Sequence, residues 1–271
     1  MERKNKLKVA IVIFIYEAAS RHFANLVNSI NCQTDSNFEV IIFNDNAQMP
    51  NKHFKRLRSK YRIINLIDDS PCGLRFQGFE ILKGLDFDVY IFQDCDDELS
   101  NNRVRIISFL ANEYKLVVND IDLINISSEL YESNIWKNRF KGSPLFKYED
   151  IASYNFVGLG NSTIHKDLLD FFPKRPKLDV VALDWYIFYS VLKKTLISGY
   201  FTSSCTTLYR QHPENEIGIA EFDKLNRIIV EKNRFNQLIG SNLIIEEKTT
   251  NVLPTQKSNN FPFWWELKKK Q

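Results

Sequence analysis

The sequence VYIFQDCDDE at positions 89–98 ends an apolar run on four acidic side chains. Crowded carboxylates repel one another and are costly to remove from water, and a divalent cation relieves both effects. Asp94 and Asp96 are therefore expected to offer oxygens to Mg2+ or Mn2+, with a nucleotide diphosphate filling the other coordination positions. The alternative for this stretch alone is a solvated turn in which Asp97 or Ser100 caps the next helix.

Two earlier apolar runs also end on polar side chains. Residues 9–15 lead into Tyr16-Glu17, and residues 38–43 lead into Asn44-Asp45. The carboxyl ends of parallel strands share one edge of a sheet, where α/β proteins bind their ligands. We therefore expect these groups and the acidic cluster to converge on one site, although they lie far apart in the sequence.

The elements that must position these groups alternate between strands and helices. Continuous apolar runs are typical of strands covered on both faces, and apolar residues three or four apart indicate amphipathic helices. Strands are expected at 9–15, 38–43, 62–67, 89–92, 116–118 and 123–126, and helices at 18–32, 51–60, 73–85, 103–114 and 221–238. This alternation predicts an α/β fold with a doubly wound, mainly parallel sheet.

The composition is that of an ordinary soluble globular protein. The 271 residues allow one large α/β domain with an appendage, and 44% of them are hydrophobic while 25% are charged. The net charge of +3 is too small to argue for nucleic acid as a partner. The four cysteines have no CxxC pairing or zinc spacing, so we expect reduced thiols in a cytoplasmic protein.

The first apolar run imitates a secretory signal because basic residues precede it. It is short and β-branched, and Tyr16-Glu17 follows where a cleavage site needs small residues, so we interpret it as a buried strand. No stretch of the sequence approaches the roughly 18 consecutive apolar residues that are needed to span a bilayer.

Two residues of the second half are further candidates for chemistry. Asp184 stands at the start of the apolar run 180–194, where capping a helix is the ordinary role of an aspartate. His212 follows the strand-like segment 206–209, and its ordinary role is that of a polar surface residue. The residues by themselves leave both alternatives open.

The order of these features resembles glycosyltransferases of family 2, which have the GT-A fold. The resemblance covers roughly residues 8–218, and the shared order and spacing make it more specific than any single motif. The segments that carry it are Ile15-Tyr16-Glu17, SINCQTDSNFEVIIFNDNA at 29–47, Gly73-Leu74-Arg75, Asp94-Cys95-Asp96-Asp97, Gly158–His165, Leu183-Asp184-Trp185, and Tyr209–His212 with Asn215.

The resemblance implies a role for each matching residue. Asp184 corresponds to the catalytic base, and Asp96 with His212 to the ligands of Mn2+ or Mg2+. Asp94 is expected at the ribose, or at the metal through water, and Arg75 near the phosphates. The remaining site residues are Ile15, Tyr16, Glu17 and Asp45 at the donor and Asn161 and Trp185 on the acceptor side.

Three of these assignments have ordinary alternatives. Tyr16 would pack on the nucleobase and Asp45 would hydrogen-bond to it, but a core aromatic and a turn residue would look the same in the sequence. Trp185 is equally suited to stacking on a sugar face and to anchoring the core.

The departures from the family pattern are Asn44 for the first Asp of an Asp-Asp pair, Leu183 for Glu and Phe14 for Pro.

The resemblance also implies a division of the chain. Residues 1–220 would form the GT-A domain, with a donor half at about 1–100 and an acceptor half at about 101–220, and residues 221–271 would add a helix, a linker and a tail. The tail, FPFWWELKKKQ at 261–271, is expected to lie peripherally on the inner face of the membrane, because its aromatic residues suit the lipid interface and its lysines suit anionic headgroups. Its alternatives are packing on the domain or an oligomer contact.

The resemblance thus implies an inverting, divalent-metal-dependent glycosyltransferase that moves a sugar from a nucleotide-diphosphate donor to a glycan hydroxyl. UDP-sugar is the favoured donor, a saccharide or lipid-linked saccharide is the acceptor, and bacterial surface polysaccharide is the expected product. A non-catalytic module that binds a nucleotide or glycan is the main alternative. A sugar-phosphate nucleotidyltransferase needs a glycine-rich loop after the first strand, and IYEAASRH contains no glycine. An aspartyl phosphatase needs its DxD motif after the first strand, whereas this one follows the fourth.

Overall fold

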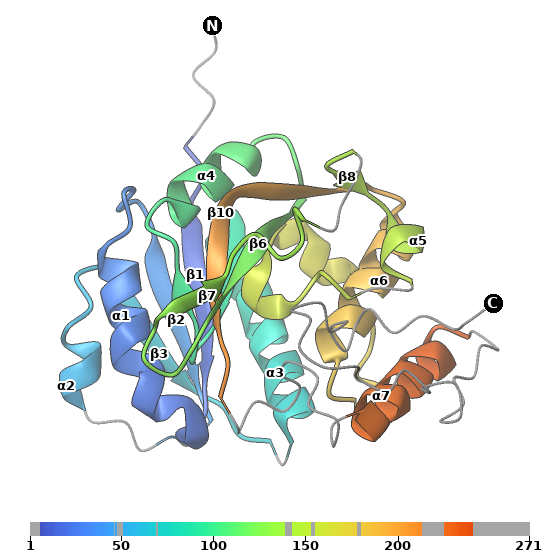
Figure 1. Ribbon diagram of the computed structural model, residues 1–271, viewed down its shortest axis with the longest axis horizontal. Coiled ribbons are helices and arrows are strands. Elements are labelled where there is room, and N and C mark those ends of the chain that lie inside the picture. The colour runs from blue at the N-terminus through green and yellow to red at the C-terminus, as the bar shows by residue number, and fades with distance from the viewer. Residues whose placement is uncertain are drawn as a thin grey trace, which may run out of the picture.

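One ten-stranded sheet organises the part of the chain that the structure describes. The computed structural model describes residues 6–45, 47, 51–68, 70–138, 143–152, 155–177, 180–212 and 225–240. The strands are β1 (Val9–Ile15), β2 (Glu39–Asn44), β3 (Tyr61–Asn65), β4 (Val89–Asp94), β5 (Glu98–Leu99), β6 (Leu116–Ile124), β7 (Leu130–Glu132), β8 (Leu145–Phe146), β9 (Ser162–His165) and β10 (Gly199–Arg210). The helices are α1 (Phe23–Asn31), α2 (Asn51–Phe54), α3 (Pro71–Gly84), α4 (Arg103–Leu110), α5 (Tyr148–Ile151), α6 (Leu183–Thr195) and α7 (Leu225–Leu238) (Figure 1).

The strand order is β3-β2-β1-β4-β9-β6-β10-β5, with β7 on β6 and β8 on β10. Strands β3, β2, β1 and β4 pair in parallel, and so do β6 and β10. The short strand β9 lies between β4 and β6 and pairs antiparallel with both, so all six long strands run in the same direction. The expected mainly parallel sheet is therefore confirmed.

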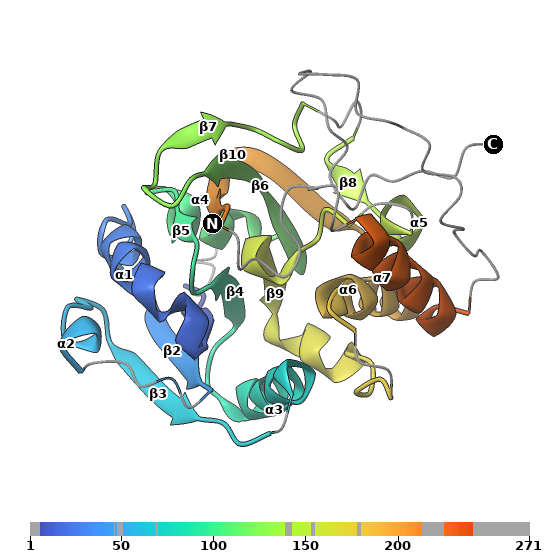
Figure 2. The same cartoon turned by 60° about the horizontal axis from the view of Figure 1, so that its bottom comes forward.

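Helices cover both faces of this sheet (Figure 2). Side chains alternate along a strand, so neighbouring residues of β1 enter different cores. Ile11 and Ile13 pack with residues of α1 and α4, whereas Ala10 and Val12 pack with residues of α3 and α6. The continuous apolar run of β1 reflects burial on both faces.

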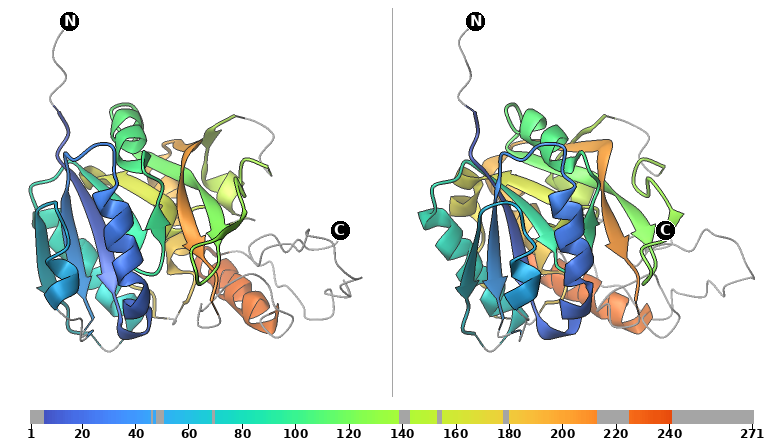
Figure 3. Two further views of the ribbon diagram at one scale, coloured as in Figure 1. Left: turned by 60° about the vertical axis from the view of Figure 1, so that its left-hand side comes forward. Right: turned by 90° about the vertical axis from the view of Figure 1, so that its left-hand side faces the viewer.

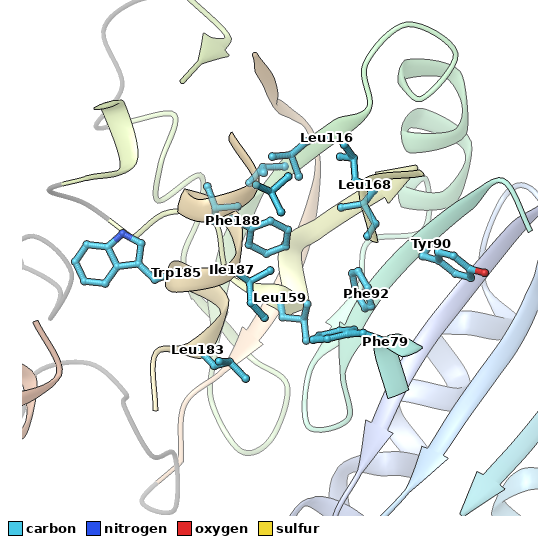
Figure 4. Packing of buried hydrophobic residues seen from close by; sticks show 14 of the residues in the cluster. Phe79, Tyr90, Phe92, Leu116, Leu159, Leu168, Leu183, Trp185, Ile187 and Phe188 are labelled. Atoms are coloured by element: carbon cyan, nitrogen blue, oxygen red, sulfur yellow. The ribbon is translucent and has the colours of Figure 1, made fainter. Parts of the chain in front are cut away.

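The core that contains Ala10, Val12 and residues of α3 and α6 joins the two halves of the chain. Leu159 lies in the same buried cluster as Phe79 and Phe92 of the first half and Phe188 of α6 (Figure 4). The rings of Phe79 and Phe92 meet edge to face, with centroids 5.9 Å apart. This packing carries the segment before β9 and the start of α6 toward the end of β4.

The carboxyl ends of the first strands converge as expected. Ile15 is the register partner of Asn44, and Phe14 is the partner of Asp94, so β1, β2 and β4 end at nearly the same level. The side views show these parallel strands running away from the N-terminal end of the molecule (Figure 3). The polar groups that follow them therefore share one edge of the sheet.

Several expected elements differ in the structure, and the helix expected at 18–32 begins as a 3-10 helix at Glu17–His22 before α1. The strands expected at 116–118 and 123–126 form one strand, β6, because the polar residues between them are paired internally. Asn119 donates to the Thr207 hydroxyl at 3.0 Å, and Asp120 accepts from the Trp136 N–H at 2.8 Å. The helix expected at 51–60 covers only Asn51–Phe54.

The C-terminal part of the chain is described only from residue 225 to residue 240. The expected helix at 221–238 is observed as α7. Asn215, the linker at 246–260 and the tail at 261–271 lie outside the described residues. Among the helices that are described, none is long and apolar enough to cross a membrane.

Candidate active site

A cavity of about 500 Å³ opens at the carboxyl ends of β1, β2 and β4. Its walls come from both halves of the chain, including the end of β4, the segment 155–161 and the start of α6. The residues predicted from the sequence that line it are Ile15, Tyr16, Asp45, Arg75, Asp94, Asp96, Asn161 and Asp184. The convergence expected from strand direction therefore brings most of the candidate residues around one cavity.

Asp96 is held by two side chains that are far from it in the sequence. Its Oδ2 lies 3.1 Å from Nε2 of His212, and it accepts a hydrogen bond from the Tyr16 hydroxyl at 3.2 Å. Burial opposes ionisation of Asp96, but the hydrogen bond from His212 holds the pKa of Asp96 below its usual value. Burial and the charge of Asp96 raise the pKa of Tyr16, so the phenol remains a neutral donor.

The geometry of Asp96 and His212 suits a divalent cation. Two adjacent ligands of an octahedral ion, each about 2.1 Å from it, lie about 3.0 Å apart. The 3.1 Å between Asp96 Oδ2 and His212 Nε2 matches that spacing, so a cation held by both groups would take the place of the Nε2 proton, and a carboxylate with an imidazole suits Mn2+ well. The described residues contain no group of three or more His, Cys, Asp or Glu side chains placed to hold a metal. A cation here would therefore need further ligands from a diphosphate and water.

Asp94 lies beside this pair and faces the cavity. Its carboxylate is 3.9 Å from the guanidinium of Arg75, and that guanidinium also lies over the ring of Phe14, 5.4 Å from its centroid. Burial raises the pKa of Asp94, Arg75 opposes this increase, and the nearby carboxylates of Asp96 and Asp184 add to it. Arg75 is thus in position to balance negative charge at this wall of the cavity.

A glycine makes room for Asp94. A Cβ atom at Gly160 would lie 2.3 Å from Asp94 Oδ2, far inside normal contact. Two residues earlier, a Cβ at Gly158 would lie 3.5 Å from Asp184 Oδ2. The segment 158–160 therefore contacts both carboxylates, and its approach to Asp94 is possible because Gly160 has no side chain.

The acidic loop after β4, residues 94–98, is held in place by Arg210, which is fully buried. The Arg210 Nε donates to the carbonyl of Asp96 at 2.8 Å, and its backbone N–H donates to Asp97 at 2.8 Å. Its guanidinium also pairs with Glu98 and donates to the carbonyls of Asn125 and Ile126, at 2.9 and 3.0 Å. Arg210 thus connects the acidic loop, the turn after β6 and the end of β10 that leads to His212.

Other buried cationic and imidazole groups surround this loop. Arg103 is fully buried behind β4, where it bonds to Gln93 and to the carbonyl of Phe92, and burial lowers its pKa to about 10. The ring of His22 lies against that of His212, with centroids 5.3 Å apart. Burial lowers the pKa of His22 to about 4, so His22 is neutral at physiological pH.

Asp184 faces the same cavity from the first turn of α6. Its Oδ2 accepts from the Leu159 N–H at 3.1 Å, and its Oδ1 accepts from the Trp185 N–H at 2.7 Å. Burial raises the pKa of Asp184, although these backbone donors and the side chain of Asn155 oppose the increase. A carboxylate has about four acceptor positions, so Asp184 retains capacity to accept a proton from a bound hydroxyl.

Asn155 is a second polar group on this wall. Its side chain bonds to Asp184, and only the amide nitrogen can donate to a carboxylate, which fixes the orientation of the amide. The Oδ1 of Asn155 is buried and has no hydrogen-bond partner among the described residues. Asn155 therefore orients the carboxylate of the candidate base from the wall of the cavity.

The structure corrects the acceptor-side expectation for Trp185. This side chain is 1% exposed, stacks on Phe235 at 3.9 Å and donates to the Ile151 carbonyl at 2.6 Å, so it anchors the core. Figure 4 shows it at the edge of the core, directed away from Leu159. Trp136 and Phe156 line the cavity from this half of the chain, and the hydrogen bond from the Trp136 N–H to Asp120 holds Trp136 in place.

Three other residues differ in detail from their expected roles. Glu17 opens a short 3-10 helix and is not among the residues that line the cavity. Asn161 lines it, but its amide nitrogen is used by the carbonyls of Asn119 and Phe156. Asn44 accepts from the Ala47 N–H and donates to Asn65, so it shapes the turn after β2 and leaves Asp45 at the cavity.

Sequence reasoning missed Arg210, Gly160 and Asn155. Arg210 had a signal, because a cation inside the strand-like run TTLYR must be paired if the strand is buried. The roles of Gly160 and Asn155 depend on the approach of two segments across the sheet. The sequence pattern contained no sign of that approach.

Comparison with known proteins supports the fold. No family model matches the chain, and no curated protein sequence matches it. The structure is similar to that of residues 1–349 of TarS from S. aureus in complex with UDP-GlcNAc, with a TM-score of 0.58, 15% identity, and coverage of 89% of this chain and 69% of that one. It is also similar to GalNAc-T7 with UDP, GalNAc and Mn2+, with a TM-score of 0.57, 13% identity and coverage of 86% of this chain and 50% of that one.

The similarity extends over part of each of the longer proteins. The chain covers 42% of a longer TarS structure, with a TM-score of 0.54. The chain therefore has the GT-A fold of nucleotide-sugar glycosyltransferases.

Proposed function

We propose that the protein is an inverting, divalent-metal-dependent glycosyltransferase of family 2 that uses a nucleotide-diphosphate sugar. The observation that carries this proposal is the single cavity that Asp94, Asp96 and Asp184 share in a GT-A fold. An acidic pair beside a histidine suits a divalent cation that would neutralise the donor diphosphate, and a separate carboxylate with a raised pKa suits proton transfer. The two groups of residues would bind the leaving group and activate the acceptor.

Asp96 and His212 would hold Mn2+ or Mg2+, which supplies Lewis-acid stabilisation of the leaving diphosphate when it is bound. Arg75 would add positive charge near the phosphates, because its guanidinium already lies at the cavity beside Asp94. Tyr16 and Asp45 would contact the nucleoside, and Asp94 the ribose or a metal-bound water. These residues would orient the donor so that its anomeric carbon faces Asp184.

Asp184 would act as the general base. Its carboxylate would take the proton of the acceptor hydroxyl while that oxygen forms a bond to the anomeric carbon. The bond from this carbon to the diphosphate oxygen would break in the same step, and its electron pair would leave with the diphosphate. Attack opposite the leaving group inverts the anomeric centre. The raised pKa of Asp184 strengthens it as a base.

A UDP-sugar is the favoured donor, and a saccharide or lipid-linked saccharide is the favoured acceptor. The structures of TarS residues 1–349 and of GalNAc-T7 contain UDP-GlcNAc and UDP, which supports this choice of nucleotide. We further propose a cytoplasmic protein that acts in bacterial surface polysaccharide synthesis, with its 261–271 tail peripherally at the membrane. Sedimentation with anionic liposomes tests the tail, because removal of residues 261–271 should abolish binding.

The activity is tested in two stages. A thermal-shift screen of nucleotide diphosphates and nucleotide sugars, each with Mn2+, Mg2+ or EDTA, should give the largest stabilisation with the true donor nucleotide and a metal. The stabilising donor is then incubated with oligosaccharide acceptors, and the products are followed by mass spectrometry. Transfer that persists unchanged in EDTA would contradict the proposed metal dependence.

The same experiment separates the enzyme from a non-catalytic binding module. A binding module would show the thermal shift without release of the nucleoside diphosphate from any donor, by transfer or by slow hydrolysis. The enzyme should show both the thermal shift and the release of the nucleoside diphosphate. Asp184→Asn should retain the thermal shift and lose the transfer.

A further inference from the structure

The start of α6, which carries Asp184, is held by a residue of another helix. Ala182 precedes α6, and its side chain makes no capping hydrogen bond. Glu231 of α7 accepts a hydrogen bond from the Val181 N–H at 2.9 Å, and its contact with the Ala182 N–H is longer, at 3.5 Å. The side chain of Glu231 is 1% exposed, so these bonds form away from water, where an unpaired group is costly.

A second contact between the same elements lies one helical turn further on. Phe235 of α7 stacks on Trp185 of α6, with ring centroids 3.9 Å apart and an interplanar angle of 8°. Glu231 and Phe235 are four residues apart and therefore share a face of α7, and Val181 and Trp185 have the same spacing. Figures 1 and 2 both show α7 lying beside α6.

Asp184 lies between these two contacts. Val181, Ala182 and Asp184 all line the cavity, whereas Trp185 is buried behind it. Asp184 is adjacent to Trp185 and lies three residues after Val181. A shift of either residue would therefore move the carboxylate of Asp184. Displacing a catalytic group by about 1 Å can cost about a hundredfold in rate.

We propose that α7 positions the catalytic carboxylate, with Glu231 as a positioning residue for Asp184. The kinetic part of this inference rests on the proposed function, and the structural part does not. Glu231 lies outside the strand-helix alternation that forms the sheet and outside the segments that carry the family resemblance. It contacts the backbone before α6, so its effect on a reaction would pass entirely through that segment.

The first measurement is amide hydrogen exchange of the full chain, compared among three variants. Glu231→Ala removes the acceptor, Glu231→Gln keeps one acceptor oxygen, and Arg234→Ala removes only the partly exposed ion-pair partner, which lies 2.7 Å from Glu231. Exchange at residues 181–185 should rise in Glu231→Ala, while Glu231→Gln and Arg234→Ala should stay close to the wild type. Unchanged exchange in Glu231→Ala would overturn the proposal.

The second measurement divides the kinetic effect. In Glu231→Ala, kcat should fall about tenfold while the KM for the donor and the Kd for UDP with Mn2+ stay within about twofold. Glu231→Gln should restore most of the kcat. A parallel loss of kcat and of UDP binding would show a general structural role and would overturn the assignment as a positioning residue.

The two proposals fail in different ways. Raised exchange at 181–185 without transfer by the wild type from any donor would reject the glycosyltransferase and keep the contact between Glu231 and α6. If Glu231→Ala does not fold, Phe235→Leu loosens the second contact and leaves the acceptor in place. That variant should lower kcat selectively, and an unchanged kcat would then overturn the role of α7.

Discussion

The acidic loop after β4 and the first turn of α6 face the same cavity but are held in different ways. Buried charges hold the acidic loop, because Arg210 pairs with Glu98 and bonds to the backbone of Asp96. Asp184 is held by the backbone N–H groups of Leu159 and Trp185. The difference suits the two proposed tasks, since a cation site needs a high density of fixed charge and a base must stay able to gain a proton.

This comparison predicts that substitutions in the acidic loop should alter donor and metal binding. Substitutions in the first turn of α6 should alter turnover. The segment 158–160 and the end of β4 are where the two regions meet. Changes there should reveal whether the regions act independently.

The largest expected effect is on the proposed base, Asp184. Asp184→Asn should lower the rate of transfer by about a thousandfold, because an amide cannot accept the acceptor proton. UDP binding with Mn2+, measured by calorimetry, should be unchanged. The matched control is Asp170→Asn, since Asp170 is exposed on a surface 3-10 helix. Transfer that survives Asp184→Asn would reject the division between the two regions.

A large effect of another kind is expected at the buried guanidinium. Arg210→Met should lower the free energy of unfolding by about 3 kcal/mol, because it leaves Glu98 without its buried ion-pair partner and the carbonyls of Asn125 and Ile126 without a donor. It should also weaken binding of UDP with Mn2+, since both Asp96 and the strand leading to His212 lose a contact. Chemical denaturation and calorimetry measure the two effects, with the exposed Arg105→Met as control. A variant with normal binding and a reduced kcat alone would contradict the assignment.

The pH dependence of kcat should sharpen the comparison. Burial raises the pKa of Asp184, and only the ionised carboxylate can act as a base. The rate should therefore fall by about tenfold for each pH unit below that pKa, and this decline should begin above the pH of about 4 that is typical of an exposed carboxyl group. Initial rates at saturating donor and metal, measured down to pH 4.5, test this. A rate that stays constant over that range would argue against Asp184 as the base.

A smaller effect is expected where the two regions meet. Gly160→Ala would place a Cβ 2.3 Å from Asp94 Oδ2, and the partly exposed carboxylate must move to avoid it. Donor affinity should fall by about fivefold, a typical result of overpacking that a flexible side chain partly relieves. Gly84→Ala is the matched control, because nothing lies within 4 Å of its added Cβ. An unchanged donor affinity together with a lower kcat would show that the segment acts on Asp184 instead.

Much of the proposed donor side of the cavity could be predicted from the sequence. The apolar runs identify β1, β2 and β4, and parallel strands have their carboxyl ends at one edge, so Tyr16, Asp45 and Asp94 had to lie close together. The predicted length of β6 was wrong, because the polar groups of Asn119 and Asp120 form their hydrogen bonds inside the fold. Hydrophobic pattern alone treats such residues as a break.

The acceptor side was harder to predict, and Trp185 and Trp136 show why. A buried anchor and a ligand-stacking ring have the same residue type and similar neighbours in the sequence. Contacts with Phe235 and Ile151 decide the role of Trp185, and both partners are more than thirty residues away. Trp136 reaches the cavity because Asp120 binds its backbone N–H, which no local pattern indicates.

The sequence by itself determined the alternation of strands and helices, and with it the edge of the sheet where the acidic cluster lies. These features follow from local periodicity and from the direction of parallel strands. The tertiary structure decided the close approach of Gly160 to Asp94, the burial of Arg210 against the acidic loop and the contact of Glu231 with the start of α6. Each of these depends on the packing of segments distant in the chain, since desolvation and close approach exist only after the core has formed.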